Sequence, residues 1–98
     1  MTFSTKHQMT TMFHEECVFA ESKGYVIPEG WKLTFNKRKT AVGLCHYGKK
    51  EVQLSTLFME TNDPETMRMT IKHELAHLIC PGDGHGNKWK SVFRHLGG

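Results

Sequence analysis

Two histidines and a glutamate form the pattern with the clearest chemical meaning in this sequence, His73-Glu74-Leu75-Ala76-His77. In an α-helix, residues four apart lie on the same face, so the imidazoles of His73 and His77 can share one metal ion. Glu74 is rotated by about 100° around the helix, where its carboxylate can reach water at the metal without becoming a ligand. Zinc lowers the pKa of such water to about 7, and Glu74 can then accept the proton as a general base. The pattern predicts zinc-dependent hydrolysis, with a peptide bond as the first candidate.

A catalytic zinc ion usually has three protein ligands and keeps a fourth position for water, so one more ligand is expected. The candidates that follow His77 are Cys80, Asp83, His85 and His95. Glycines flank His85, and they allow the chain to turn back toward the helix after the helix-breaking pair Pro81-Gly82. Trp89, four residues later, can anchor the returning chain in the core. We therefore expect His73, His77 and His85 to bind a single zinc ion.

The other three candidates have ordinary structural explanations. Cys80 lies near the same helix face, but small buried cysteines are common and a thiolate would reduce the Lewis acidity of zinc. Asp83 either orients a ligand histidine or caps the loop. His95 is expected to be solvated near the end of the chain.

The residues around the motif predict the helix that must carry it. Asp63 is a suitable N-cap, Pro64 suits the first helical position, and Glu65 lies in the first turn, where the helix dipole favours an anion. An apolar stripe of Met67, Ile71, Leu75 and Leu78 follows at helical spacing. The histidines therefore fall in the middle of a capped amphipathic helix.

The rest of the chain alternates between helical and strand-like periods. The expected elements are a helix over residues 7–23, strands over residues 31–36, 41–47 and 51–57, and a last helix from Asn87 with Trp89, Phe93 and Leu96 on its inner face. Gly48-Lys49-Lys50 is a short connection typical of a hairpin. This pattern predicts an α+β domain with a three-stranded antiparallel sheet.

Length and composition limit the possible classes of protein. The chain has 98 residues, enough for one domain over residues 1–98, and it has no apolar run long enough to span a membrane. We expect a cytoplasmic protein because the N-terminus lacks the apolar segment of a signal peptide. Three widely spaced cysteines suit reduced thiols better than disulfides. A net charge of +3 permits contact with nucleic acid but does not by itself indicate it.

Taken together, these segments resemble the SprT-like family of zinc metallopeptidases, which includes proteases that act on DNA-protein crosslinks. The resemblance rests on three stretches in the same order. They are the hairpin residues Leu33-Thr34-Phe35-Asn36 and Gly43-Leu44-Cys45, the His73–His77 motif, and Gly84-His85-Gly86 followed by Trp89. It implies a minimal zincin-like domain in which His73, His77 and His85 bind zinc and Glu74 is the catalytic acid and base.

The same resemblance implies a protein or peptide substrate, with DNA as a possible further partner. Contacts with DNA would have to come from Lys37, Arg38, Lys39, Lys49 and Lys50 at the turns or from Lys88, Lys90 and Arg94 beside the site. Cys45 matches a hairpin position that has no known catalytic task.

Two other functions are compatible with the sequence. One is a zinc-stabilised module that binds nucleic acid or protein without catalysis, and the other is a zinc hydrolase that acts on nucleic acid. Glu74 beside His73 favours the peptidase. The sequence contains no clear oxyanion stabiliser, although Tyr47 or His46 on the hairpin is placed where it could face the metal.

Overall fold

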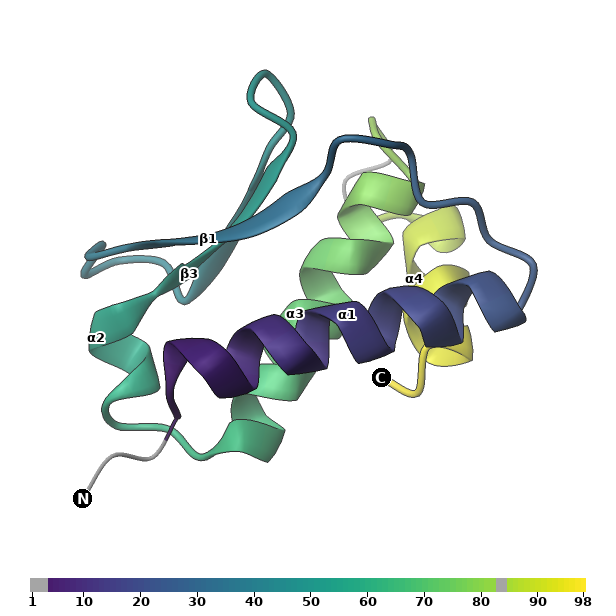
Figure 1. The fold of residues 1–98 in the computed structure, drawn as a ribbon. Helices are drawn as coiled ribbons and strands as arrows, with labels where there is room; N and C mark the ends of the chain where they lie inside the picture. Colours follow the sequence, from purple (N-terminus) through teal and green to yellow (C-terminus); the bar gives the residue numbers. More distant parts are fainter. Residues whose placement is uncertain (1–3, 83–84) are drawn as a thin grey trace.

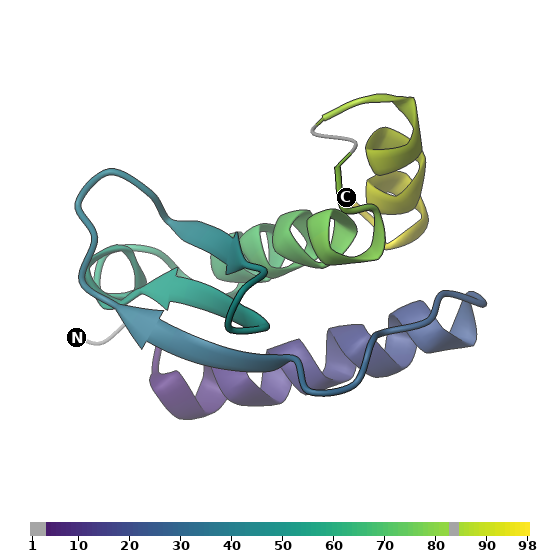
Figure 2. The same cartoon turned by 90° about the horizontal axis from the view of Figure 1, so that it is seen from above.

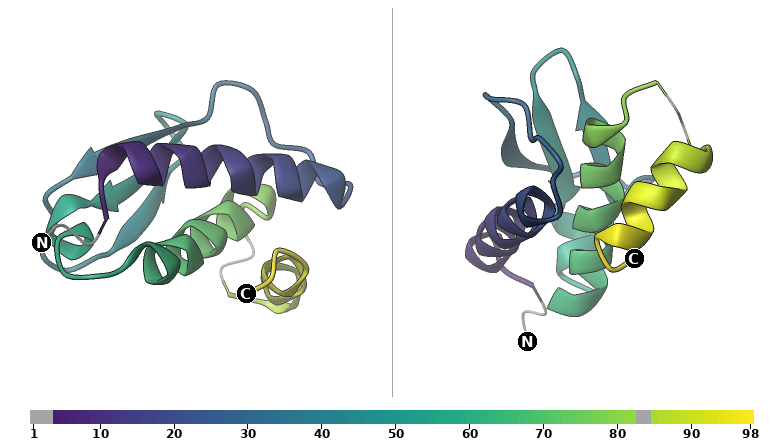
Figure 3. Two further views of the ribbon diagram at one scale, coloured as in Figure 1. Left: turned by 60° about the horizontal axis from the view of Figure 1, so that its bottom comes forward. Right: turned by 90° about the vertical axis from the view of Figure 1, so that its right-hand side faces the viewer.

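The computed structural model describes residues 4–82 and 85–98, and within them it contains four helices and a three-stranded sheet. In chain order the elements are α1 (Lys6–Ser22), β1 (Lys32–Asn36), β2 (Gly43–His46), β3 (Glu51–Ser55), α2 (Thr56–Met59), α3 (Pro64–Ile79) and α4 (Asn87–His95). The sheet lies to one side of the long helices (Figure 1), and α3 lies between α1 and α4 (Figures 2 and 3). This arrangement confirms the α+β class.

The sheet is mixed, so the prediction of a fully antiparallel sheet was wrong. The strand order is β1-β3-β2, with β1 parallel to β3 and β2 antiparallel to β3. The expected β2–β3 hairpin is present, but the chain between β1 and β2 crosses the end of β3. Three hydrogen bonds hold that crossing segment, from the Ser55 hydroxyl to the Arg38 carbonyl (2.6 Å), from the Ser55 amide to the Val42 carbonyl (2.9 Å) and from the Thr56 hydroxyl to the Asn36 carbonyl (3.2 Å). Alternating polarity predicts strands but does not specify their neighbours.

A short helix interrupts the expected third strand. The strand-like pattern of residues 51–57 predicts one strand, whereas the strand ends at Ser55 and α2 begins at Thr56. The alternation of Val52 and Leu54 with polar residues ends at Ser55, and the four residues of α2 are too few to show a helical period.

The inner face of the sheet packs against α1 and α3. Val52 and Leu54 of the central strand are fully buried there, and their register partners on β2 are Cys45 and Gly43. The outer face carries polar side chains that bond to one another, including Asn36 to Gln53 at 3.0 Å. Cys45 is therefore directed toward α3, which carries the predicted motif.

The apolar core joins this sheet face to the three long helices. Its buried side chains are Met9, Met12, Phe13, Ala20, Val52, Leu54, Met59, Met67, Ile71, Leu75, Ala76, Leu78, Trp89, Val92 and Leu96. The expected inner face of α4 is largely confirmed, because Trp89 and Leu96 are buried, while Phe93 is half-buried and Val92 is buried as well. Among the described residues, no helix is both long enough and apolar enough to cross a membrane.

Candidate metal centre

The helix that carries the motif begins and ends where the sequence predicts. The Asp63 carboxylate accepts a hydrogen bond of 2.7 Å from the Thr66 amide, and this bond lowers the pKa of Asp63. Pro64 occupies the first helical position, and the helix ends at Ile79 with Cys80 as its C-cap. Regular helix from Pro64 onward places His73 and His77 on successive turns.

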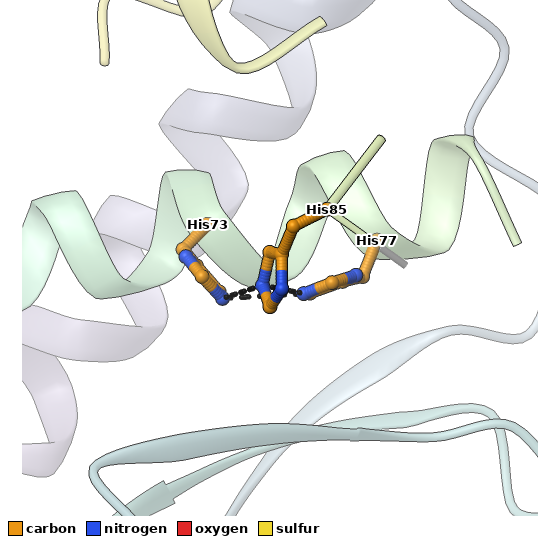
Figure 4. Close-up of side chains that lie close together, drawn as sticks. All are labelled: His73, His77 and His85. Atoms are coloured by element: carbon orange, nitrogen blue, oxygen red, sulfur yellow. Dashed lines mark hydrogen bonds between the residues drawn. The ribbon is translucent and has the colours of Figure 1, made fainter. Parts of the chain in front are cut away.

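Three imidazoles converge at one point on the surface of α3 (Figure 4). The Nε2 atom of His77 lies 3.2 Å from that of His73 and 3.1 Å from that of His85, and the His73 and His85 nitrogens are 3.2 Å apart. His85 reaches this position from the segment between α3 and α4. The turn back toward the helix that we expected for this segment is therefore confirmed.

These nitrogens have the spacing that zinc requires. Three imidazole nitrogens bonded to a tetrahedral zinc ion at 2.0–2.1 Å are separated by about 3.3 to 3.4 Å, close to the distances in this triangle. Without a cation, three Nε2 atoms facing one another cannot all find a hydrogen-bond partner within the triangle. The residues present therefore fit a zinc ion.

Electrostatics favour the metal-binding form of His73 and His77. Burial lowers the pKa of His73 and, together with the neighbouring imidazoles, that of His77. A lowered pKa favours the neutral ring with a free lone pair, which is the ligand form of histidine.

Glu74 lies beside the triangle in a nearly closed environment. Its side chain is 8% exposed, and one carboxylate oxygen (Oε2) is 4.0 Å from Nε2 of His73. Burial raises the pKa of Glu74 to about 7, and the nearby Cys45 side chain partly offsets this effect. A carboxyl group with a pKa near neutrality can both accept and return a proton.

Strand β2 approaches α3 closely at the level of Glu74. A Cβ atom added to Gly43 would meet Cγ2 of Thr70 at 2.8 Å and Cγ of Glu74 at 3.3 Å. The Cys45 thiol donates to the Glu74 carbonyl at 3.0 Å. Gly43 thus permits the close packing that places the edge strand next to the carboxylate.

An open hollow of about 390 Å³ adjoins Glu74 and His73. Its walls are formed by Val42, Gly43, Met69, Thr70, His73, Glu74 and Phe93. The hollow therefore lies between the edge strand, the motif helix and α4, and its apolar walls come from all three.

Trp89 holds the first turn of α4 against the histidines. Its indole N–H donates to the His73 carbonyl at 3.3 Å, and its ring centroid lies 4.8 Å, 5.3 Å and 4.7 Å from those of His73, His77 and His85. Trp89 is 7% exposed, so the expected role as an anchor is confirmed.

Of the alternative ligands, the two that lie within the described residues do not join this cluster. Cys80 is half-buried and lies outside the set of metal-ligating atoms that converge among the described residues. His95 is exposed and contacts the Tyr25 hydroxyl at the far end of α4. Asp83 lies outside the described residues, as does Gly84.

Of the two hairpin side chains considered for the site, Tyr47 is hydrogen-bonded to the motif helix and His46 to its own turn. The Tyr47 hydroxyl donates to the His77 carbonyl at 3.0 Å, whereas Nδ1 of His46 accepts a bond from the Lys49 amide within its own turn. Burial, followed by Cys45 and Glu74, raises the pKa of Tyr47. The alternation of side chains along a strand distinguishes these neighbours, because Tyr47 continues the series of Gly43 and Cys45 that faces α3, whereas His46 falls on the other face.

Solved metallopeptidase structures share this fold. The metallopeptidase zymogen jannalysin of Methanocaldococcus jannaschii matches with a TM-score of 0.74 at 21% identity, over 88% of this chain and 78% of that chain. The zymogen abylysin of Pyrococcus abyssi matches with a TM-score of 0.73 at 14% identity, over 89% and 77%. The expected minimal zincin fold is confirmed.

Sequence comparison adds relatives and a family. Protein SprT of Proteus mirabilis is 32% identical over 63 residues, and Protein SprT of Vibrio atlanticus is 29% identical over 69 residues. These matches cover 59% and 65% of this chain but only 38% and 42% of those proteins, so the chain spans about two fifths of the relatives. A model of the SprT-like family matches residues 6–98, which include every side chain of the histidine triangle, and the chain belongs to that family.

Proposed function

We propose that this chain is a zinc-dependent metallopeptidase in which His73, His77 and His85 hold one zinc ion and Glu74 is the general base. The observation that supports this most directly is the triangle of Nε2 atoms 3.1–3.2 Å apart with the Glu74 carboxylate at its side. Bound zinc would supply a Lewis acid that polarises a peptide carbonyl and makes water acidic.

The residues of the chain divide the remaining work among them. A Glu74 carboxylate oxygen accepts the proton of the attacking water and then delivers it to the nitrogen of the leaving amine. Burial of Glu74 supports both transfers, since it brings the pKa to about 7. Trp89 fixes the imidazoles through its contacts with their rings.

An extended polypeptide is the substrate that suits the surface next to Glu74. Strand β2 is an edge strand, and its free edge can pair with an added strand. A bound strand would pass the hollow lined by Val42, Met69 and Phe93. We therefore propose unfolded or flexible protein segments as substrates, with an apolar side chain in the hollow.

The hollow predicts a measurable preference. Met69 is 42% exposed, so Met69→Lys should fold normally while placing a charge in the apolar wall. For a peptide with leucine beside the cleaved bond, we expect the variant's kcat/KM to be about 10- to 100-fold lower than that of wild type. The ratio of kcat/KM for the matching glutamate peptide to kcat/KM for the leucine peptide should rise. Val26→Lys is the matched control, because Val26 is exposed and lies outside the hollow. Equal losses on both peptides would contradict an apolar subsite.

A direct assay tests the proposed activity. We expect the zinc-loaded chain to cleave a reduced, alkylated, denatured protein, to lose this activity on chelation, and to regain it with zinc but not with magnesium. Cleavage that persists without metal would contradict the mechanism. No cleavage by a chain with one bound zinc would instead favour the non-catalytic binding module.

DNA-associated proteins are the narrower class of substrate that we propose to test in the same assay. The supporting observation is that the basic side chains at the turns and on α4 are all exposed, namely Lys37, Arg38, Lys39, Lys49, Lys50, Lys88, Lys90 and Arg94. A rate of cleavage that increases with DNA and loses this increase at high salt would support contact with phosphates.

We also propose a cytoplasmic location, which suits the three free cysteines.

A further inference from the structure

A buried charge cluster lies on the side of α3 that faces α1, away from the hollow. Glu16 of α1 is 5% exposed, and Lys72 of α3 is 9% exposed. Nζ of Lys72 is 2.6 Å from one Glu16 carboxylate oxygen, and Nη1 of Arg68 is 2.8 Å from the other. Burying an ammonium group is costly unless its N–H groups have partners.

The partners of Lys72 link three helices. Besides the bond to Glu16, Nζ donates to the carbonyl of Leu96 at 2.5 Å, and it lies 5.5 Å from the centre of the Phe19 ring. Leu96 is the C-cap of α4. The last carbonyls of a helix have no intrahelical partner and carry the negative end of its dipole, so a buried cation is well placed there. We call Glu16, Lys72 and Leu96 the clamp.

The clamp and the metal centre hold opposite ends of the same helix. The first turn of α4 carries Trp89, which contacts all three imidazoles, and His85 immediately precedes that helix. The other end of α4 is held by the clamp through Leu96, whose side chain is fully buried. Because a helix moves as a rigid rod, release of its C-terminal end would change the angle at which its N-terminal end meets α3.

We infer that Lys72 is a positioning residue for the metal centre, because its bond to the Leu96 carbonyl fixes α4 and thereby the distance of His85 from the His73 and His77 pair. This inference rests on the proposed zinc site. It assigns to Lys72 a task that differs from that of Arg68, which binds the same glutamate one helical turn earlier but does not contact α4 among the described residues.

The test compares zinc affinities, measured by competition with a chromophoric chelator. We expect Lys72→Met to bind zinc about tenfold more weakly than wild type, as is usual when the support of a ligand is lost. Arg68→Met is the matched control and should lower thermal stability without changing zinc affinity. A Lys72→Met protein that binds zinc as tightly as wild type would overturn the inference.

A double-mutant cycle separates positioning from general destabilisation. Once His85 is absent its position has no effect, so Lys72→Met combined with His85→Ala should bind zinc no more weakly than His85→Ala alone. The absorption spectrum of the cobalt-substituted Lys72→Met protein should shift toward that of His85→Ala. If the double variant instead lost zinc affinity by the sum of the two single losses, positioning through His85 would be contradicted.

Folding and metal binding can be told apart in this design. If Lys72→Met alone is unfolded by circular dichroism, Glu16→Gln with Lys72→Met removes both buried charges and should restore the fold, yet it still lacks the donor to Leu96. This pair should retain the zinc defect, and wild-type affinity in it would overturn the inference. Failure of the wild-type chain to bind zinc would instead refute the proposed function.

Discussion

Glu74→Gln is expected to lower kcat by about 10²- to 10⁴-fold while the protein keeps one zinc ion per chain. Glutamine has nearly the same shape as glutamate, so the packing against Gly43 and Cys45 should persist. It cannot accept a proton from water or return one to the leaving amine. Cleavage is measured on the denatured protein substrate, and zinc content by elemental mass spectrometry on the same preparation.

Glu65→Gln is the matched control for this variant. It makes the same substitution on the same helix, but Glu65 is exposed and lies outside the metal centre. Its kcat should equal that of wild type. Full activity in Glu74→Gln would refute the role of Glu74 as general base, whereas joint loss of activity and zinc would show that Glu74 supports metal binding instead.

His85→Ala is expected to lower zinc affinity by more than about 100-fold, because it removes one of three ligands rather than the support of a ligand. Wild type should contain about one zinc per chain, and the variant should lose it during dialysis against a weak chelator. His95→Ala is the matched control, since His95 is exposed at the other end of α4. Its zinc content should be unchanged.

Two results would contradict this prediction: zinc retained by the variant, or zinc absent from the wild type. Full zinc occupancy in His85→Ala would show that another group completes the site, and Cys80→Ala would then be the variant to examine. Absence of zinc from the wild type, even after zinc is supplied, would remove the hydrolytic hypotheses for both peptide and nucleic acid. A small basic binding domain would then be the better interpretation.

The sequence predicted those parts of the molecule that depend on local rules. The caps and apolar stripe of α3, the hairpin between β2 and β3, and the start of α4 at Asn87 are each specified by residues close in the chain. The convergence of His85 on the motif helix was also predictable, because a helix-breaking pair and two glycines leave few other paths for so short a segment.

Features that depend on distant residues were not predictable in the same way. The parallel pairing of β1 with β3 follows from a crossing held by Ser55 and Thr56, and no pattern in the strands themselves specifies it. The buried pair of Glu16 and Lys72 is separated by 56 positions, and each residue considered alone resembles an ordinary surface charge. The hydrogen-bond partner of Tyr47 was not predictable either, because it is a main-chain carbonyl.

The histidine triangle also bears on the order in which the chain folds. Its members are separated by 4, 8 and 12 positions, and Trp89 follows His73 by 16, whereas the contact between Glu16 and Lys72 spans 56. The entropy lost on closing a loop grows with its length, so the helical hairpin of α3 and α4 loses little chain entropy when it forms. Chain entropy therefore favours early assembly of the histidine triangle and late docking of α1, which would let a metal ion bind a partly folded chain.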